Sequence, residues 1–209
     1  MRVEIWSDIV CPWCYIGKAR FDKALAAFEH RDEVEVEFRS FELEPGRDKQ
    51  DVEPVERMLT RKYGPQAAGM EERVAELARA EGLGFRVDRE VGSTFDAHRL
   101  LHLARDHGVG NDLADALFDA NFADARPLFT GDALPQVAAK VGLDEEDVRR
   151  VLADPTAYAE AVRREEREAA DLGATGVPFF VIDRRLAVAG GQPTEVFARA
   201  LERAWQESH

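Results

Sequence analysis

The sequence predicts an α/β fold in which a large all-helical block is inserted between a βαβ unit and a ββα unit. Three observations support this prediction. Strand patterns of period two occur near both ends of the chain, helix patterns fill the middle, and the only two cysteines lie at the first strand-to-helix turn. A mixed sheet of four strands with flanking helices follows from this order of elements.

The predicted βαβ unit covers residues 1–41. Its first strand alternates Val3 and Ile5 with Glu4 and Trp6, and it ends near Asp8. From the cysteines onward the apolar residues recur at helical spacing, as Phe21, Ala24, Leu25 and Phe28. The segment "VEVEFRSF" returns to strict alternation, which indicates a half-buried strand, and we place that strand at an edge of the sheet.

The middle of the chain carries no convincing strand pattern. A polar segment, "ELEPGRDKQDVEP", leads into it as a loop. Residues 55–173 then show five to six helices with breaks at Gly64-Pro65, Gly82-Leu83-Gly84, Gly108-Val109-Gly110 and Asp154-Pro155. We therefore expect residues 55–173 to form an inserted helical domain.

The predicted ββα unit begins with "VPFFVIDRRLAVAGG". Its two apolar runs, 179–182 and 186–189, are joined by three polar residues and predict a β-hairpin. A last helix follows, with Phe197, Ala200, Leu201 and Ala204 on one face. Residues 1–54 and 174–209 are thus predicted to form one discontinuous α/β domain.

Composition and charge exclude several classes of protein. The net charge is -13 over 209 residues, with no basic stripe, which argues against a nucleic-acid binder. No apolar run of membrane-spanning length and no signal-peptide core occurs, so we expect a cytoplasmic protein without a membrane partner. Because thiols are kept reduced in the cytoplasm, a permanent structural disulfide is not expected.

Cys11 and Cys14 form a C-P-W-C motif, which at a βα turn is typical of a thioredoxin-like redox centre. Cys14 falls on the apolar stripe of the helix and Cys11 on its polar side, so we expect Cys11 to face substrate and Cys14 to lie behind it. The helix dipole favours a Cys11 thiolate, and cysteines so placed have pKa values of roughly 3.5–7.5. Pro12 suits the first helical turn. Trp13 is expected to shape the docking surface.

Two other interpretations of the cysteine pair stay open. The thiols could be ordinary buried cysteines three residues apart. Alternatively, they could join His98 and His102, which lie four residues apart on one helix face, in a tetrahedral zinc site of a non-enzymatic binding module. More than eighty residues separate the two pairs, far beyond the compact spacing of zinc fingers. The shared face continues to Arg105 and is expected to be solvated or to face substrate, so no metal is predicted.

Four segments together resemble the DsbA family of thioredoxin-fold oxidoreductases: "SDIVCPWCYIGKARF", "TFDAHRLLHLA", "GVPFFVID" and "GGQPTEVFARAL". The chain is most similar to the cytoplasmic FrnE-type branch, some members of which are encoded near polyketide biosynthesis genes. The resemblance runs from Val3 to about Leu201. It implies a thioredoxin-like fold with a helical insertion, and a thiol–disulfide oxidoreductase or isomerase acting on protein or small-molecule substrates.

The resemblance also implies that Val177-Pro178 is a cis peptide beside the thiols, where the backbone of Val177 would pair with substrate. From sequence alone, Pro178 could equally be an ordinary proline at the start of a strand. Trp13 replaces a histidine often found in exported members of the family, so the resemblance does not decide whether this protein is a strong oxidant. Apart from the redox-active disulfide no cofactor is predicted, although glutathione is compatible as a reductant or co-substrate.

The same architecture occurs in 2-hydroxychromene-2-carboxylate isomerases and kappa-class glutathione transferases. These enzymes resemble the chain at "TFDAHRL" but carry a serine in place of Cys11, so a glutathione-dependent isomerase or transferase is the alternative function. The same segment gives Thr94 and His98 as candidate substrate contacts, although Thr94 is also a suitable helix N-cap. Asp8, three residues before Cys11, could accept the proton of Cys14. The sequence indicates no oligomeric state.

Overall fold

The computed structural model describes residues 1–67 and 69–208. They divide into two compact units, which are described separately. We call residues 1–43 with 163–209 the α/β unit and residues 44–162 the helical unit. The sequence predicted the changes of domain at 54/55 and 173/174 instead.

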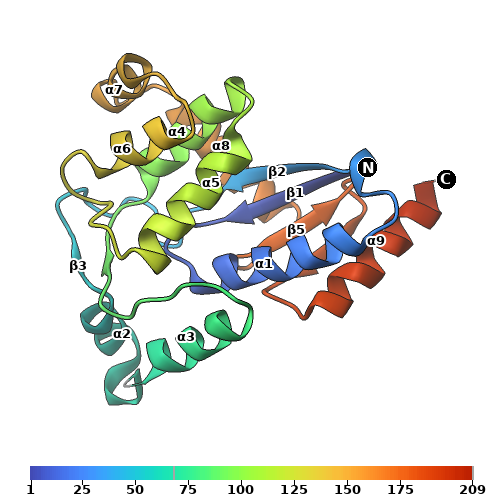
Figure 1. The fold of residues 1–209 in the computed structure, drawn as a ribbon. Helices are drawn as coiled ribbons and strands as arrows, with labels where there is room; N and C mark the ends of the chain where they lie inside the picture. Colours follow the sequence, from blue (N-terminus) through green and yellow to red (C-terminus); the bar gives the residue numbers. More distant parts are fainter. Residues whose placement is uncertain (68, 209) are drawn as a thin grey trace. The chain divides into compact units, whose positions relative to one another are not determined.

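The α/β unit contains a four-stranded mixed sheet (Figure 1). The strands are β1 (Arg2–Ser7), β2 (Glu35–Ser40), β5 (Phe179–Ile182) and β6 (Leu186–Ala189). Their order is β2-β1-β5-β6, in which β1 and β2 run parallel and the other neighbours antiparallel. The predicted mixed sheet, the edge position of the second strand and the C-terminal hairpin are therefore confirmed.

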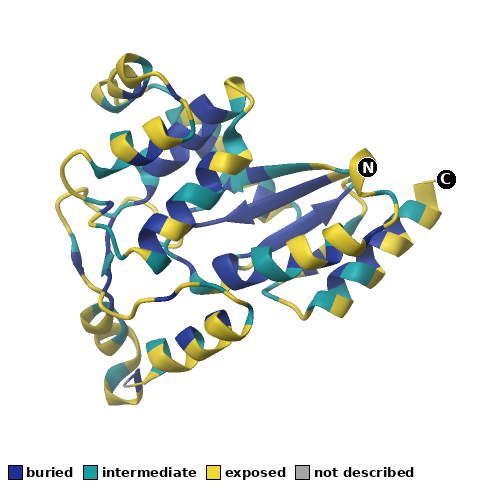
Figure 2. Ribbon diagram, in the orientation of Figure 1, coloured by how far each residue is buried: buried dark blue, intermediate teal, exposed yellow. Residues whose placement is uncertain are grey.

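Helices cover both faces of this sheet because its buried side chains alternate. On one face, α1 (Pro12–Ala27) and α9 (Thr194–Ser208) pack side by side, and Phe21, Phe180 and Phe197 form an aromatic cluster there. On the other face, Trp6, Phe179 and Val181 pack against Ala169 of α8 (Ala159–Asp171). The central strands β1 and β5 are buried almost throughout, whereas the edge strands β2 and β6 are only partly buried and α1 and α9 are buried along one side (Figure 2). Apolar residues recur every second residue in the strands and about every 3.6 residues in the helices, which explains why each element buries one face in these layers.

Helix α8 explains why the predicted second change of domain, at 173/174, lies later in the chain than the observed one at 162/163. From Arg163 onward it belongs to the α/β unit. Its Glu165 carboxylate accepts the backbone N–H of Ser40 at 2.7 Å, and its Glu165 carbonyl accepts the indole N–H of Trp6 at 2.8 Å. An amphipathic pattern shows that a helix has a buried face, but it does not show which sheet or helix that face contacts.

Over the residues that the structure describes between 55 and 153, the helical unit has six α-helices: α2 (Val55–Tyr63), α3 (Met70–Ala80), α4 (Phe95–Asp106), α5 (Gly110–Phe118), α6 (Ala133–Lys140) and α7 (Glu145–Ala153). With α8, the described part of 55–173 holds seven α-helices, so the expectation of five to six was too low. Gly131 lies in the turn before α6 and Gly142 in the turn after it, both at positive φ, and no break was predicted at either position. A π-helical turn, Asp119–Ala123, continues α5.

Two very short strands pair in this unit, and the second of them contradicts the expectation that residues 55–173 lack strands. β3 (Glu53–Pro54) pairs antiparallel with β4 (Glu90–Val91). Two-residue strands are too short to produce a recognisable alternation, so the sequence pattern could not reveal them.

The buried Arg99 holds α4 to the end of α7. Its guanidinium donates to the carbonyl oxygens of Val151 and Asp154, both at 2.6 Å, and to Asp96 Oδ1 at 2.6 Å. Arg99 is fully buried. It thus supplies donors to carbonyl groups that a helix C-terminus leaves without intrahelical partners.

None of the helices in residues 1–67 and 69–208 is both long enough and apolar enough to span a membrane.

Candidate active site

The β1–α1 turn places the two thiols at the N-terminus of α1. Cys11 is the N-cap residue, with extended backbone dihedrals (φ -83°, ψ 112°), and Pro12 occupies the first helical turn. The Cys11 N–H donates to the carbonyl of Asp8, and the Cys14 N–H donates to the carbonyl of Cys11, both at 3.0 Å. Proline fits here because the first helical N–H groups have no intrahelical acceptor.

Both cysteines are buried free thiols. Cys14 is 1% exposed, as its place on the apolar stripe predicts. Cys11 is only 4% exposed, which corrects the expectation that it lies open on the polar side of the helix. Its Sγ lies 3.7 Å from the carbonyl oxygen of Val177, so the chain before Pro178 covers it. This contact joins residues 166 positions apart, which helical periodicity cannot describe.

The two thiols have pKa values shifted in opposite directions. The pKa of Cys11 lies below that of an ordinary thiol, chiefly because the Cys14 side chain donates a hydrogen bond to its sulfur, and backbone N–H groups of Cys14 and Trp13 add to this. The pKa of Cys14 lies well above the ordinary range, chiefly because burial removes its sulfur from water and because the Cys11 thiolate is adjacent. The arrangement therefore favours a thiolate on Cys11 and a neutral thiol on Cys14.

Asp8 is a buried carboxylate next to this pair. It is 1% exposed, and its Oδ2 accepts the backbone N–H of Leu43 at 2.8 Å. Its negative charge raises the pKa of Cys11 and so acts against the hydrogen bond from Cys14. Asp8 is the carboxylate that the sequence singled out, and the structure places it where its charge acts on Cys11.

The loop after α8 completes the site. The Val177-Pro178 peptide bond is cis. The carbonyl of Pro178 accepts the N–H of Gly190 at 2.8 Å, which fixes the loop to the end of β6. A Cβ atom on Gly17 would lie 3.1 Å from Pro178 Cγ and 3.1 Å from Gly191 Cα. Gly17 therefore lets α1 approach this loop closely.

Sequence reasoning missed Gly17, Arg20 and Gly191 as parts of the site. Arg20 Nη1 donates to the carbonyl of Gly191 at 2.7 Å, and a Cβ atom on Gly191 would lie 3.0 Å from the carbonyl oxygen of Trp13. A signal for Gly17 was present, because glycine inside a helix costs stability unless close packing requires it. Arg20 gave no such signal, since its acceptor lies 171 residues away.

Two large apolar residues next to the site are exposed. Trp13, between the cysteines, is 41% exposed, and Leu43, whose N–H bonds to Asp8, is 43% exposed. Pro12 is half-buried between Cys11 and Trp13. Large apolar side chains exposed beside a reactive group are typical of surfaces that dock another molecule.

Thr94 and His98 lie in the helical unit, not in the unit that carries the thiols. Thr94 is at the N-cap position of α4, as predicted, although its side chain makes no capping hydrogen bond. His98 is fully buried, and His102 is 6% exposed and stacks on Tyr158. The expectation that the face of His98 and His102 is solvated is therefore wrong, because α4 is buried on nearly all sides.

The structure also bears on the zinc alternative. Within residues 1–67 and 69–208, no group of three or more histidine, cysteine, aspartate or glutamate side chains is arranged to hold a metal ion.

Comparison with known proteins gives a consistent picture. The sequence profile of the DSBA-like thioredoxin domain matches residues 2–202. A probable DsbA oxidoreductase from Streptomyces coelicolor is 61% identical in its crystal structure, with a TM-score of 0.95 over 99% of this chain and 91% of that one.

Two more distant structures share the fold. A 2-hydroxychromene-2-carboxylate isomerase is 16% identical, with a TM-score of 0.70 over 100% of this chain and 98% of its own. The cytosolic disulfide reductase DsbM from Pseudomonas aeruginosa, solved with GSH, is 19% identical, with a TM-score of 0.66 over 99% of this chain and 100% of its own.

Proposed function

Because the chain belongs to the DsbA-like thioredoxin domain family, we propose that it is a thiol–disulfide oxidoreductase acting through Cys11 and Cys14. The observation that carries the proposal is the opposed pKa shift of two adjacent thiols at the N-terminus of α1. One thiol is held as the nucleophile, and the other is kept protonated until a mixed disulfide forms beside it. Substrates are proteins or small molecules that carry a disulfide or a dithiol.

In the reductive direction, the Cys11 thiolate attacks one sulfur of a substrate disulfide. The substrate S–S bond breaks, its second sulfur leaves as a thiolate, and a Cys11–substrate mixed disulfide forms. Cys14 then loses its proton and attacks the Cys11 sulfur, which releases the remaining substrate thiolate. The substrate gains two electrons, and the enzyme becomes a Cys11–Cys14 disulfide. The reverse sequence oxidises a substrate dithiol.

The residues around the thiols have distinct roles in this mechanism. Asp8 accepts the Cys14 proton, because it is a buried carboxylate whose charge acts on the adjacent Cys11 and whose backbone donates to Cys14. The backbone of Val177, whose carbonyl lies 3.7 Å from Cys11 Sγ, is our candidate for pairing with an extended substrate. Pro178 fixes that segment, and Pro12 and Trp13 form part of the docking surface. Contact of Thr94 and His98 with substrate stays a prediction from the sequence.

The test combines activity with trapping. The purified protein should reduce insulin with a thiol reductant and should reoxidise a reduced model protein from its disulfide form. Cys11→Ser should abolish both activities. Cys14→Ser should accumulate a mixed disulfide with substrate, because no thiol remains to resolve it. Equal behaviour of Cys11→Ser and Cys14→Ser would refute the assignment of roles.

The fold shared with 2-hydroxychromene-2-carboxylate isomerase supports one alternative, a glutathione-dependent isomerase or transferase. In that case glutathione would be the co-substrate, and Cys11→Ser would retain activity, since those enzymes carry serine there. If the oxidoreductase proposal holds, glutathione acts only as a reductant of the enzyme disulfide. Glutathione-dependent turnover by Cys11→Ser would favour the alternative.

Several finer points stay predictions from the sequence alone. They are the FrnE-type branch, service to polyketide biosynthesis, a cytoplasmic location, and the absence of nucleic-acid, membrane and metal partners. Cell fractionation tests the cytoplasmic location, and metal analysis of the purified protein tests the absence of a metal.

A further inference from the structure

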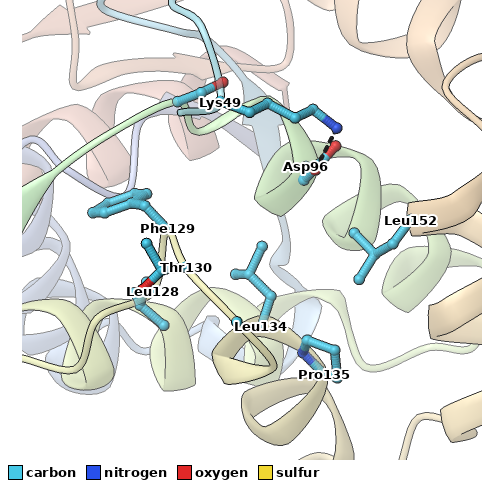
Figure 3. A pocket seen from close by; sticks show the side chains of 10 residues that line it. Lys49, Asp96, Leu128, Phe129, Thr130, Leu134, Pro135 and Leu152 are labelled. Carbon is cyan, nitrogen blue, oxygen red and sulfur yellow. Dashed lines mark hydrogen bonds and ion pairs between the residues drawn. The ribbon is translucent and has the colours of Figure 1, made fainter. Parts of the chain in front are cut away.

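The helical unit contains a small cavity of about 240 Å³. Its walls come from the end of the first loop of the unit, from α4, from the turn before α6, and from α6 and α7 (Figure 3). All lining residues fall within 44–162, so none of them belongs to the dithiol site. The volume lies just below the roughly 300–1,000 Å³ of pockets that take drug-sized ligands, which limits an occupant to a compact molecule.

The cavity has an apolar wall and a charged rim. Leu128, Phe129, Leu134, Pro135 and Leu152 supply the apolar side chains. In Figure 3 they surround one space, and the charged pair Lys49 and Asp96 lies across that space from α6. A ligand that matches this wall and this rim has an apolar body and one polar or charged group.

The charge on the rim selects an anion. Asp96 Oδ1 accepts from Arg99 Nη2 at 2.6 Å, and Asp96 Oδ2 accepts from Lys49 Nζ, also at 2.6 Å. Two cations therefore share one carboxylate, so this group carries one net positive charge, within a chain whose net charge is -13. The fully buried Arg99 keeps Asp96 satisfied, whereas the Lys49 side chain is 55% exposed. Lys49 can turn to a second carboxylate without leaving Asp96 unpaired.

The apolar wall is preformed. Gly92 has no side chain, and a Cβ atom there would lie 2.6 Å from Phe129 Cγ and 2.7 Å from Phe129 Cβ. The turn that carries Phe129 is closed by the Thr130 N–H, which donates to the carbonyl of Pro127 at 3.2 Å, and by the Leu128 N–H, which donates to the carbonyl of Arg126 at 2.8 Å. A ligand would therefore not have to organise the wall that it contacts.

We propose that this cavity, the Lys49–Phe129 pocket, binds a compact monocarboxylic acid, with the carboxylate on Lys49 and the apolar body between the turn and α6. This site is independent of the thiol–disulfide chemistry. A neutral molecule of the same shape would lose the Lys49 contact. A carboxylate without an apolar body would gain nothing from the wall.

The test uses three probes with the full-length protein: 4-fluorobenzoate, the neutral 4-fluorobenzamide, and acetate. Fluorine and amide NMR titrations measure their binding. We expect 4-fluorobenzoate to bind with a Kd on the order of 1 mM, and to shift the amide signals of Gly131, Leu134 and Leu152. 4-Fluorobenzamide should bind about two- to fivefold more weakly, because an exposed lysine contributes that much. Acetate should show no saturable binding.

Variants identify the site. Lys49→Gln should weaken 4-fluorobenzoate about two- to fivefold and leave 4-fluorobenzamide unchanged. The matched control Lys140→Gln, an exposed lysine on α6 outside the pocket lining, should change neither. Leu134→Trp should abolish binding of both aromatic probes by filling the cavity. If Leu134→Trp perturbs the fold, Thr130→Tyr at the exposed turn provides the second filling variant.

The proposal fails if 4-fluorobenzoate does not saturate, or if its shifts map to residues outside the pocket. It also fails if Lys49→Gln and Lys140→Gln affect binding equally, or if the filling variants bind the probes as the wild type does. None of these outcomes depends on redox activity, so the dithiol mechanism is tested separately.

Discussion

Replacing Cys14 with alanine tests how the site makes Cys11 reactive. The hydrogen bond from the Cys14 side chain is the largest cause of the low pKa of Cys11. Cys14→Ala removes that donor and leaves the backbone donors of the first helical turn in place. We therefore expect the pKa of Cys11 to rise in this variant.

The size of the effect follows from the strength of the lost interaction. A hydrogen bond to a charged group contributes about 1.5–3 kcal/mol, and a thiol is a weak donor, so we take about 1.5 kcal/mol. At a pH below the pKa, this loss lowers the thiolate population roughly tenfold. A more basic thiolate is also more nucleophilic, with a Brønsted coefficient of about 0.4–0.5, which recovers roughly threefold. The net expectation is alkylation about threefold slower.

The measurement is the rate of Cys11 alkylation by iodoacetamide as a function of pH, with the thiolate absorbance as a second readout. Cys14→Ser is the matched control, because its hydroxyl keeps a donor at the same position and should hold the profile near that of the wild type. Asp8→Asn should move the profile the other way, since it removes the negative charge that raises the pKa of Cys11.

The reasoning is refuted if the alkylation profile of Cys14→Ala coincides with that of Cys14→Ser or shifts to lower pH. Such a result would mean that the helix N-terminus alone stabilises the thiolate. Wild-type Cys14 should stay unreactive across the same range, because its own pKa is raised by burial.

Three further predictions concern the packing around Gly17, the hydrogen bonds of Arg99 and the zinc content of the protein. Gly17→Ala should destabilise the protein by about 1–3 kcal/mol in urea unfolding and slow insulin reduction, because its Cβ would meet Pro178 and Gly191 at 3.1 Å; unchanged activity would contradict the close approach. Arg99→Met should cost about 3 kcal/mol or more, since buried carbonyls lose their donor, whereas the exposed Arg149→Met should cost less than about 0.5 kcal/mol. Purified protein should hold well under one zinc per chain and keep its circular dichroism in chelator; zinc release with unfolding would revive the zinc alternative.

The four strands of the sheet, and the edge position of β2, could be predicted because period-two patterns are local. The alternation at β1 and β2, the hairpin of β5 and β6, and the buried face of α9 all depend on neighbouring residues in the chain. The chemistry of the site could be predicted in part for the same reason. Cys11, Cys14 and Asp8 lie within seven residues, and the strand-to-helix turn that holds them is itself a local signal.

Long-range contacts limited the rest of the prediction. Cys11 was expected to be exposed because helical periodicity places it on the polar side, yet the chain at Val177, 166 residues away, covers it. For the same reason Arg20 was missed as part of the site, since its acceptor is the distant Gly191. The last predicted helix, α8, was likewise placed in the inserted domain, although its Glu165 bonds to Ser40. In each case the sequence specified a side chain correctly as polar or helical but did not specify what it would contact.

The segment "TFDAHRLLHLA" has a role in packing that its sequence pattern did not reveal. Its histidines suggested a metal or substrate face, but His98 is fully buried in α4. Its Arg99 ties α4 to the carbonyl groups at the end of α7, and Asp96 holds that guanidinium. An arginine that must satisfy several buried acceptors is replaced with difficulty, so such a segment would remain recognisable even if it never touched substrate. Motifs that surround a nucleophile and motifs that hold a scaffold therefore look alike in the sequence, and only the acceptors of the arginine distinguish them.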